Sequence, residues 1–433
     1  MRKPTHAATV LAAALVLALI ALPAASQQLP TASPESVGFD STRLKKLDDY
    51  MAGVVAEGRV AGMTTLLARH GKIVHSKIYG KADLAKNTPM TADAIFRIYS
   101  MTKPITGVAM MMLFEEGKWQ LDDPVTKFVP EFKNMRVFTG TDAKGQMITE
   151  PMKRPPTMRE LMSHTAGFAY GLTGTNPVDK LMQAKQFRTA KSLQEMIQRI
   201  AEVPLLYQPG TDWSYSVATD IQGYIVEKLS GQQLGAYLDQ HIFKPLKMTD
   251  TSFHLRPGME SRLAQLYANN PADGTLMLGT AVWDISKPRS MESGGGGLIS
   301  TTADYARFCQ MLLNKGELEG ARLLSPASVE LMGTNVVPRA VLAKSPGVGS
   351  ARFDENRGFG LDFAVTMDPR ARGVLEGRGT ITWGGAAGTW FWIDPTNDLF
   401  FVGMIQRLGG TGGDDLSQQA RTLTYQALVH PEK

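Results

Sequence analysis

The sequence has a single cysteine among its 433 residues, Cys309, so neither an intrachain disulfide nor a cysteine-ligated metal cluster can form. This cysteine lies within residues 304–313, whose alternation of apolar and polar residues is typical of an amphipathic helix. A thiol in such a helix more often packs than reacts. We therefore predict a buried structural role for Cys309.

Several catalytic and ligand-binding motifs are also missing. The chain has neither the H-E-x-x-H pattern of zinc proteases nor the G-x-S-x-G elbow of α/β-hydrolases. It lacks both glycine-rich phosphate-binding patterns, G-x-x-x-x-G-K-[ST] and G-x-G-x-x-G. The net charge of +5 is small for this length, and the basic residues form no stripe, which argues against nucleic-acid binding.

Only one long hydrophobic run is present, and it lies at the N-terminus, over residues 7–22. Arg2 and Lys3 precede it and small residues follow it up to Ser26, which is the order of a cleaved secretory signal. The run is too short to span a bilayer comfortably, and an uncleaved anchor is the alternative. We therefore expect residues 1–26 to be a signal peptide, the protein to be exported to the periplasm or the medium, and no stable membrane span to remain after cleavage.

The most informative short pattern in the chain is Ser100-x-x-Lys103. A serine three residues ahead of a lysine shares a helix face with it. The apolar run 108–114 that follows predicts a buried helix, whose free N–H groups and dipole favour negative charge at its start. Apolar surroundings also make a lysine easier to deprotonate, so that it can help to activate the serine hydroxyl. About one such pattern is expected by chance in a chain of this length, so the interpretation depends on the rest of the sequence.

Before this pattern, the sequence predicts a helix and a hairpin. The helix opens at Ser41, with apolar residues at helical spacing at Leu44, Leu47, Met51 and Val54. The hairpin pairs residues 64–69 with 72–77 around a turn at His70-Gly71. His75 is interpreted as a strand residue, with a role as a base as the less favoured alternative.

Residues 157–167 predict a further helix, in which Thr157 is the N-cap and Glu160 completes a capping box. His164 would lie in the last turn of this helix, where contact with a backbone carbonyl is ordinary. A structural role for His164 is therefore favoured over a catalytic one.

Tyr215 follows a turn at residues 208–211 and directly precedes an amphipathic helix at 220–229. Functional residues often lie at such loop–helix junctions, although a half-buried packing tyrosine is the alternative. The four glycines 294–297 fit either the edge of a site or a plain flexible turn.

The last part of the chain predicts strands at 359–365, 380–393 and 399–405, and a closing helix at 414–429. Trp383-Gly384-Gly385 lies within the second of these strands. Glycine has no side chain, so a ligand can pass close to the strand backbone at this position.

Taken in order, these pieces resemble the serine β-lactamase and penicillin-binding protein superfamily, most closely its class C-like branch and the family VIII carboxylesterases within it. The resemblance covers about residues 33–429 and depends on four landmarks in the expected order. These are Ser100-x-x-Lys103 for the first motif, residues 161–167 for the helix ending in His-Thr-Ser-Gly, Pro209-Gly210 leading to Tyr215-Ser216 for the second motif, and Trp383-Gly384-Gly385 where β-lactamases carry Lys-Thr-Gly.

Two residues depart from the β-lactamase pattern. Val217 replaces the asparagine of the usual Tyr-x-Asn motif, and Trp383 replaces the lysine of the third motif. In β-lactamases these two groups help to bind the amide and the carboxylate of the lactam. Their loss makes the site more apolar and suits an uncharged ester, and family VIII esterases share the Trp-x-Gly form.

The resemblance implies covalent acyl transfer, in which Ser100 attacks the ester carbonyl. Tyr215, with Lys103 beside it, would act as the general base and later activate the deacylating water. The sequence leaves open which of Lys103 and Tyr215 holds the proton at rest.

The resemblance also implies the remaining parts of the site. The backbone N–H groups of Ser100 and Ala386 would form the oxyanion hole. Trp383, Gly384 and Gly385 would line the substrate pocket, and no metal or cofactor is needed.

The implied fold is α+β, of the β-lactamase/transpeptidase type. An antiparallel sheet from the early hairpin and the late strands would be flanked by the first and last helices, with a mainly helical region packed against it. Residues 27–433 would form one catalytic domain, with its α/β part at about 27–90 and 290–433 and its helical part at about 90–290. Ser100 would lie at the seam.

The predicted activity is the hydrolysis of carboxylic esters with short to medium acyl chains, with weak β-lactam hydrolysis as a secondary activity. The first alternative is a β-lactamase, D,D-peptidase or D-amino-acid peptidase that acts on amides, and Val217 and Trp383 argue against it. The second is a penicillin-binding-like sensor that is acylated without turnover. The presence of Ser100, Lys103 and Tyr215 together argues against a sensor.

Overall fold

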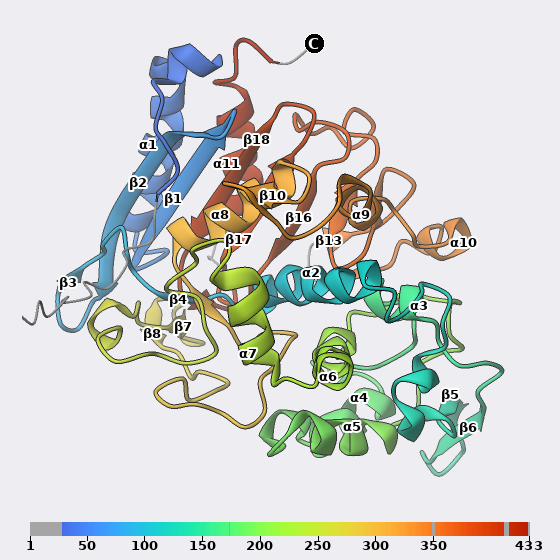
Figure 1. Cartoon of the computed structure of the whole chain (residues 1–433). Coiled ribbons are helices and arrows are strands. Elements are labelled where there is room, and N and C mark those ends of the chain that lie inside the picture. Colours follow the sequence, from blue (N-terminus) through green and yellow to red (C-terminus); the bar gives the residue numbers. More distant parts are fainter. Residues whose placement is uncertain (1–27, 173, 349–350, 411–414, 432–433) are drawn as a thin grey trace, which may run out of the picture.

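The computed structural model describes residues 28–172, 174–348, 351–410 and 415–431, so the expected signal peptide lies outside the described residues. The chain has two parts. Its two ends form an α/β part, and its middle forms a mainly helical part (Figure 1). Its α-helices are α1 (Ser41–Ala56), α2 (Thr102–Glu115), α3 (Met158–Met162), α4 (Pro177–Ala184), α5 (Leu193–Ala201), α6 (Ala218–Ser230), α7 (Leu234–Leu238), α8 (Thr302–Leu313), α9 (Pro326–Met332), α10 (Arg339–Leu342) and α11 (Leu416–Tyr425).

The central element is an antiparallel sheet in which both ends of the chain take part. Its strand order is β14-β15-β16-β17-β18-β1-β2-β3. The bounds are β1 (Gly62–Arg69), β2 (Lys72–Asp83), β3 (Thr88–Pro89), β14 (Arg357–Phe359), β15 (Ala364–Thr366), β16 (Ile381–Gly384), β17 (Trp390–Asp394) and β18 (Leu399–Met404). The pairing of β1 with β18 joins the N-terminal hairpin to the C-terminal strands, so both ends of the chain contribute to one sheet.

Short strand pairs lie outside the central sheet. They are β4 (Phe96–Arg97) with β9 (Ile299–Ser300), β5 (Arg136–Thr141) with β6 (Met147–Pro151), β7 (Tyr267–Asn269) with β8 (Leu276–Leu278) and β19 (Arg407–Leu408), β10 (Glu317–Leu318) with β11 (Ala321–Arg322), and β12 (Gly347–Val348) with β13 (Ala351–Arg352).

Each face of the sheet is covered by helices, and strand alternation decides which side chains meet which helices. On β17, Trp390 and Trp392 face α1 and α11, whereas Phe391 and Ile393 belong to the larger core on the other face. α8 packs on that second face against β1, β17 and β18. The α+β fold predicted from the sequence is confirmed, with the first and last helices together on one side of the sheet.

Several local predictions are confirmed in detail. α1 begins at Ser41 and buries the four apolar residues expected, although the side chain that caps it belongs to Asp40. The hairpin turns at His70-Gly71, both of which have positive φ angles. α3 has the predicted capping box between Thr157 and Glu160. Cys309 is fully buried in α8.

Three local predictions are wrong. The run 380–393 forms two strands, β16 and β17, joined by a turn, so Gly385 lies outside the strand in which it was expected. The helix that starts after Thr157 ends at Met162, so His164 lies beyond it, in a left-handed conformation with φ of +61°. The run 359–365 is not one strand but two, β14 and β15, separated by a turn in which Asp362 has φ of +64°. Aspartate tolerates this conformation better than most residues, and the apolar residues around it gave the run its strand-like pattern.

The Asp362 carboxylate is buried among the helices that carry the site. Its Oδ1 accepts hydrogen bonds from Thr219 Oγ1 at 3.2 Å and Gln222 Nε2 at 3.1 Å, both on α6, and a Cβ at Gly107 of α2 would lie 2.7 Å from Oδ2. Burial raises the pKa of Asp362 from 3.8 to about 7, against the opposing effect of these hydrogen bonds. The charged form of this carboxyl is therefore disfavoured in the folded protein.

This carboxyl predicts a pH-dependent loss of stability. The folded protein binds the Asp362 proton more tightly than the unfolded chain, so the free energy of unfolding should fall as the pH rises from about 4 to about 7, by up to roughly 4 kcal/mol. Asp362→Asn should remove this decline. Urea unfolding of the two proteins between pH 4 and pH 8 measures the difference, and parallel pH curves would contradict the prediction.

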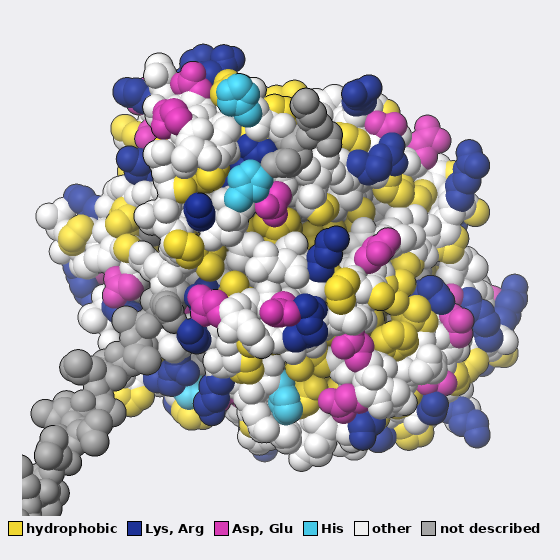
Figure 2. Space-filling model, turned by 45° about the horizontal axis from the view of Figure 1, so that its top comes forward, with side chains coloured by type: hydrophobic (Ala, Val, Ile, Leu, Met, Phe, Trp, Pro, Cys, Tyr) yellow, Lys and Arg dark blue, Asp and Glu magenta, His cyan; other side chains and the backbone are white. Residues whose placement is uncertain are grey.

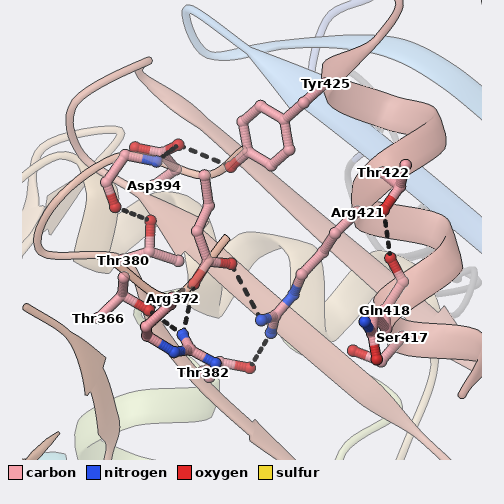
Figure 3. Close-up of polar contacts among 12 residues, drawn as sticks. Thr366, Arg372, Thr380, Thr382, Asp394, Ser417, Gln418, Arg421, Thr422 and Tyr425 are labelled. Atoms are coloured by element: carbon pink, nitrogen blue, oxygen red, sulfur yellow. Dashed lines mark hydrogen bonds and ion pairs between the residues drawn. The ribbon is translucent and has the colours of Figure 1, made fainter. Parts of the chain in front are cut away.

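On the opposite face of the sheet, a buried ion-pair network fixes α11 to β16 (Figure 3). Glu376 has no exposed side-chain surface and pairs with Arg372 at 3.3 Å and Arg421 at 2.9 Å. Arg421 also donates to Thr382 Oγ1 at 2.7 Å. Because Thr382 points to this network, the next residue along β16, Trp383, points to the other face, where the helical region lies.

No helix in the described ranges is both long and apolar enough to cross a membrane. On the face drawn in Figure 2, basic and acidic side chains are interspersed rather than gathered by sign. This pattern agrees with the absence of a basic stripe in the sequence.

Candidate active site

Ser100 lies at the entrance to a helix that is enclosed by protein. It belongs to the 3₁₀ turn Tyr99–Met101, which runs directly into α2, and every residue of α2 from Thr102 to Met111 is buried. Tyr99 has a φ angle of +41°, a conformation that aromatic residues rarely adopt and that is found mainly where a structure constrains a functional site. Ser100 itself is only partly buried, so its hydroxyl is accessible beside a rigid helix.

Lys103 places its ammonium group among three oxygen atoms. Its Nζ lies 3.3 Å from Ser100 Oγ, 3.2 Å from the Tyr170 hydroxyl and 2.6 Å from the Gly295 carbonyl oxygen. An ammonium group has three N–H donors, so each can have one acceptor here. The side chain is 1% exposed, and a cation so deeply buried requires such partners.

The protonation state of Lys103 differs from the sequence-based expectation. Burial alone would lower its pKa, but the negative charges of Tyr170 and Tyr215, when ionised, and of Asp220 outweigh burial, and the net effect raises the pKa above its ordinary value. The expectation that apolar surroundings make this lysine easy to deprotonate is therefore wrong. The raised pKa favours the ammonium form of Lys103.

Tyr215 lies on the other side of this ammonium group. The Lys103 Nζ is 4.7 Å from the centre of the Tyr215 ring, and Trp383 Nε1 donates a hydrogen bond to the Tyr215 hydroxyl at 3.3 Å. Trp213 stacks parallel to the Tyr215 ring at 6.4 Å between centroids. The Tyr215 oxygen thus accepts an indole N–H, and the Lys103 cation lies close to the Tyr215 ring.

His164 lies behind Tyr215. Its ring centroid is 5.0 Å from that of Tyr215, and its Nδ1 shares a 3.0 Å hydrogen bond with Ser216 Oγ. Complete burial, with a smaller effect from Lys103, lowers the pKa of His164 well below its ordinary value, so the ring is neutral. These contacts support the structural interpretation of His164.

The glycine run is the edge of the site. The Gly295 carbonyl accepts from Lys103, and its N–H donates to Asp220 Oδ1 at 3.1 Å. Ser293 also donates its hydroxyl to Asp220. A Cβ at Gly295 would overlap the Asp220 carboxylate, and one at Gly294 would lie 2.7 Å from the Thr219 carbonyl oxygen. Only glycine allows the loop to approach α6 this closely.

The hairpin turn between β16 and β17 forms the opposite wall. Trp383 is 8% exposed and packs its ring against Tyr215. A Cβ at Gly385 would overlap the Ile98 carbonyl oxygen, so the turn lies against the chain just before Ser100. Ala386 is exposed at the corner of this turn. Gly384 and Gly385 are partly exposed in the same wall.

Sequence reasoning missed three groups that contact or surround Lys103: Tyr170, Asp220 and the Gly295 carbonyl. Tyr170 lies in the loop after α3, and its hydroxyl contacts Lys103, which is 67 residues earlier in the sequence. The sequence pattern places Asp220 only in an amphipathic helix, and the glycine run fits two interpretations. The signal for Asp220 was an acidic residue in the first turn of α6 that turns out to be 1% exposed.

Comparison with known proteins places the chain among related hydrolases. The family model described as Beta-lactamase matches residues 47–426. An uncharacterised protein from Mycobacterium tuberculosis is 35% identical over 353 residues, which are 81% of this chain and 86% of that protein. Esterase EstB from Burkholderia gladioli is 30% identical over 388 residues, 83% of this chain and 89% of its own.

Among solved structures, EstCE1, "a hydrolase with promiscuous acyltransferase activity", superimposes with a TM-score of 0.72 at 24% identity. The match covers 89% of this chain and 99% of that structure. At this identity the likeness shows the fold alone. Together with the family model over residues 47–426, it shows that most of the chain has a beta-lactamase-type fold.

Proposed function

The chain belongs to the beta-lactamase family of hydrolases, and from that premise we propose that it is a serine carboxylesterase acting on short to medium acyl chains through an acyl-enzyme on Ser100. The observation that carries the proposal is that Ser100 Oγ and the ring of the Trp383-bound Tyr215 both lie beside the Lys103 ammonium. Its known relatives include esterases, and the finer assignment to carboxylic esters comes from the chemistry of these side chains.

In the proposed acylation step, the Ser100 oxygen attacks the ester carbonyl carbon while its proton passes to the Tyr215 oxygen. The Lys103 ammonium and the Trp383 N–H stabilise the ionised Tyr215 before the transfer. Collapse of the tetrahedral intermediate breaks the ester C–O bond, and Tyr215 returns the proton to the leaving alkoxide. Water then repeats the sequence, with Tyr215 as base and Ser100 as the leaving group.

The developing oxyanion needs donors that are already oriented. We propose the backbone N–H groups of Ser100 and Ala386, because the turn that carries Ala386 lies against the chain entering Ser100. One such donor typically contributes about 3 kcal/mol to the transition state.

The wall formed by Trp383 favours esters over β-lactams. Trp383 presents a neutral indole where a lactam carboxylate would require a cation in the β-lactamase pattern, and its N–H is used by Tyr215. Val217 is completely buried and leaves no amide side chain at the second motif. Amide hydrolysis is therefore the competing function that the experiment must test.

The experiment compares turnover of p-nitrophenyl butyrate and a chromogenic cephalosporin by the purified chain beginning at residue 27. We expect sustained ester hydrolysis with little cephalosporin cleavage. Faster cephalosporin cleavage would replace the esterase assignment by a β-lactamase. A single burst of product equal to the enzyme concentration, without further turnover, would indicate an acylated sensor.

We further propose that the protein is exported and that residues 1–26 are removed. The basic start, the apolar run 7–22 and the small residues up to Ser26 support this proposal. Expression of the full chain in a Gram-negative host, followed by cell fractionation and mass analysis of the N-terminus, tests it. A cytoplasmic product that retains residue 2 would contradict it.

A further inference from the structure

Two arginines rest on aromatic rings that border the site. The guanidinium carbon of Arg188 lies 4.4 Å from the centre of the Phe187 ring and 5.0 Å from that of Tyr170. The Tyr170 hydroxyl is 3.2 Å from the Lys103 Nζ. Arg188 is therefore separated from the catalytic lysine by a single tyrosine ring.

Arg289 approaches from the loop on the other side. Its guanidinium carbon lies 5.3 Å from the centre of the Trp283 ring, and Trp283 packs against Tyr99, the residue before Ser100, at 6.3 Å between centroids. Trp283 also covers Gly296, where a Cβ would lie 3.2 Å from its ring. Arg289 thus packs on the same tryptophan that lies against the glycine loop, whose Gly295 carbonyl accepts from Lys103.

The two arginine segments meet. Arg289 Nη2 donates to the Arg188 carbonyl oxygen at 3.4 Å, which joins the 3₁₀ turn Phe187–Thr189 to the loop that follows β8. This contact places the Arg289 guanidinium against the backbone of residue 188, although the two residues are 101 positions apart, so both arginines belong to one edge of the site. We call Arg188 and Arg289 the arginine pair.

Neither member of the arginine pair forms an ion pair with a carboxylate of the described residues. Within the described residues, several other arginines have carboxylate partners, such as half-buried Arg199 with Glu195 at 2.6 Å and buried Arg307 with Glu319 at 2.7 Å. No such ion pair joins Arg188 or Arg289 to an acid of the described chain. Asp284, which is exposed, faces Arg289 only at longer range, and burial lowers the pKa of Arg289 more than Asp284 raises it.

Partial burial of two cations without a counter-charge is costly, and a bound anion would relieve that cost. Guanidinium groups bind carboxylates through paired, charge-assisted hydrogen bonds, and rings that stack on one face of a guanidinium leave its edge free for such bonds. The three donors of Lys103 are already used, so a substrate carboxylate would find its partners in the arginine pair.

We propose that the arginine pair is an anion subsite that selects esters carrying a carboxylate on the acyl or the alcohol part. The inference depends on the proposed esterase activity and narrows its substrate class. It differs from the expectation of an uncharged ester, which considered only the wall formed by Trp383 and Val217. In this proposal, Trp383 and Val217 keep one side of the site apolar, and the arginine pair supplies positive charge at its edge.

Two matched pairs of esters test the subsite. p-Nitrophenyl hemiglutarate against p-nitrophenyl butyrate places the carboxylate on the acyl part, and 4-carboxyphenyl butyrate against phenyl butyrate places it on the alcohol part. We expect about a tenfold higher kcat/KM for the acidic member of at least one pair, mainly through KM, and a smaller preference at high salt.

Arg188→Gln and Arg289→Gln should each remove most of this preference while changing kcat/KM for the neutral ester less than about threefold. Lys228→Gln is the matched control, because it removes a cation that rests on the Tyr224 ring at 5.6 Å, near the far end of α6. Equal losses for acidic and neutral esters in the arginine variants would overturn the proposal, since they would indicate a structural role only.

A binding measurement separates the subsite from the esterase proposal. The Ser100→Ala protein is titrated with phenyl hemiglutarate and phenyl butyrate, with tryptophan fluorescence as the readout. We expect tighter binding of the acidic ester, and loss of the difference when Arg188→Gln or Arg289→Gln is added. Equal binding of both esters would overturn the anion subsite even if the enzyme hydrolyses neutral esters, whereas absence of turnover with selective binding would overturn only the esterase.

Discussion

Ser100→Ala will reduce kcat/KM for p-nitrophenyl butyrate by at least about 10⁴-fold, because no acyl-enzyme can form without the hydroxyl. The residual rate will come from binding and the oxyanion donors alone. The side-chain hydrogen bond to Lys103 at 3.3 Å is long, so its loss will change stability by less than about 1 kcal/mol. Steady-state kinetics and thermal unfolding of the same preparation measure both effects.

The matched control for this variant is Ser76→Ala. Ser76 is exposed on β2, and the variant makes the same chemical change away from the site. It should retain full activity. A fluorophosphonate ester should add its mass to the peptide that contains Ser100 in the wild type and in Ser76→Ala, but not in Ser100→Ala. Retention of more than about 1% of the wild-type rate by Ser100→Ala would show that another nucleophile acts.

Much of the fold is encoded locally, and these parts were predictable. The apolar spacing of α1, the turn at His70-Gly71 and the capping box at Thr157 each involve residues within a few positions of one another, so the pattern alone determines the structure. Asp362 shows where this reasoning fails. Its left-handed turn is held by Thr219 and Gln222, more than a hundred residues earlier in the chain.

The contacts of the candidate site are also of two kinds, local and distant in the sequence. The spacing of Ser100 and Lys103 is local, and their 3.3 Å contact follows from one turn of helix. The contact of Lys103 with Gly295 spans 192 residues, and that with Tyr170 spans 67. Tyr170, Tyr215 and Asp220 oppose the effect of burial on the pKa of Lys103, and their net effect is the reverse of what its apolar neighbours alone predict.

Lys103→Met should lower kcat/KM for ester hydrolysis by about 10³-fold, because it removes the charge that stabilises ionised Tyr215 and the donor that holds Ser100 Oγ. Methionine is similar in length to lysine and places no N–H donor where the Lys103 ammonium group lies. Lys118→Met is the control, since Lys118 is exposed just beyond the end of α2. The double variant Ser100→Ala/Lys103→Met should be no slower than Ser100→Ala, because the two groups act in one step.

The pH dependence of the activity lost in Lys103→Met distinguishes two roles for Lys103, a fixed cation and the resting base. Its pKa is raised, so the ammonium form persists throughout pH 6 to 9, and the ratio of wild-type to Lys103→Met activity should stay constant across that range. If neutral Lys103 were the resting base, the active fraction would grow about tenfold per pH unit below its pKa, and the ratio would rise with it. The ratio is read below the pH at which the wild-type rate levels off, because loss of the Lys103 charge also alters the ionisation of Tyr215 above that pH. A constant ratio assigns Lys103 the role of a fixed cation and leaves Tyr215 as the group that accepts the proton from Ser100.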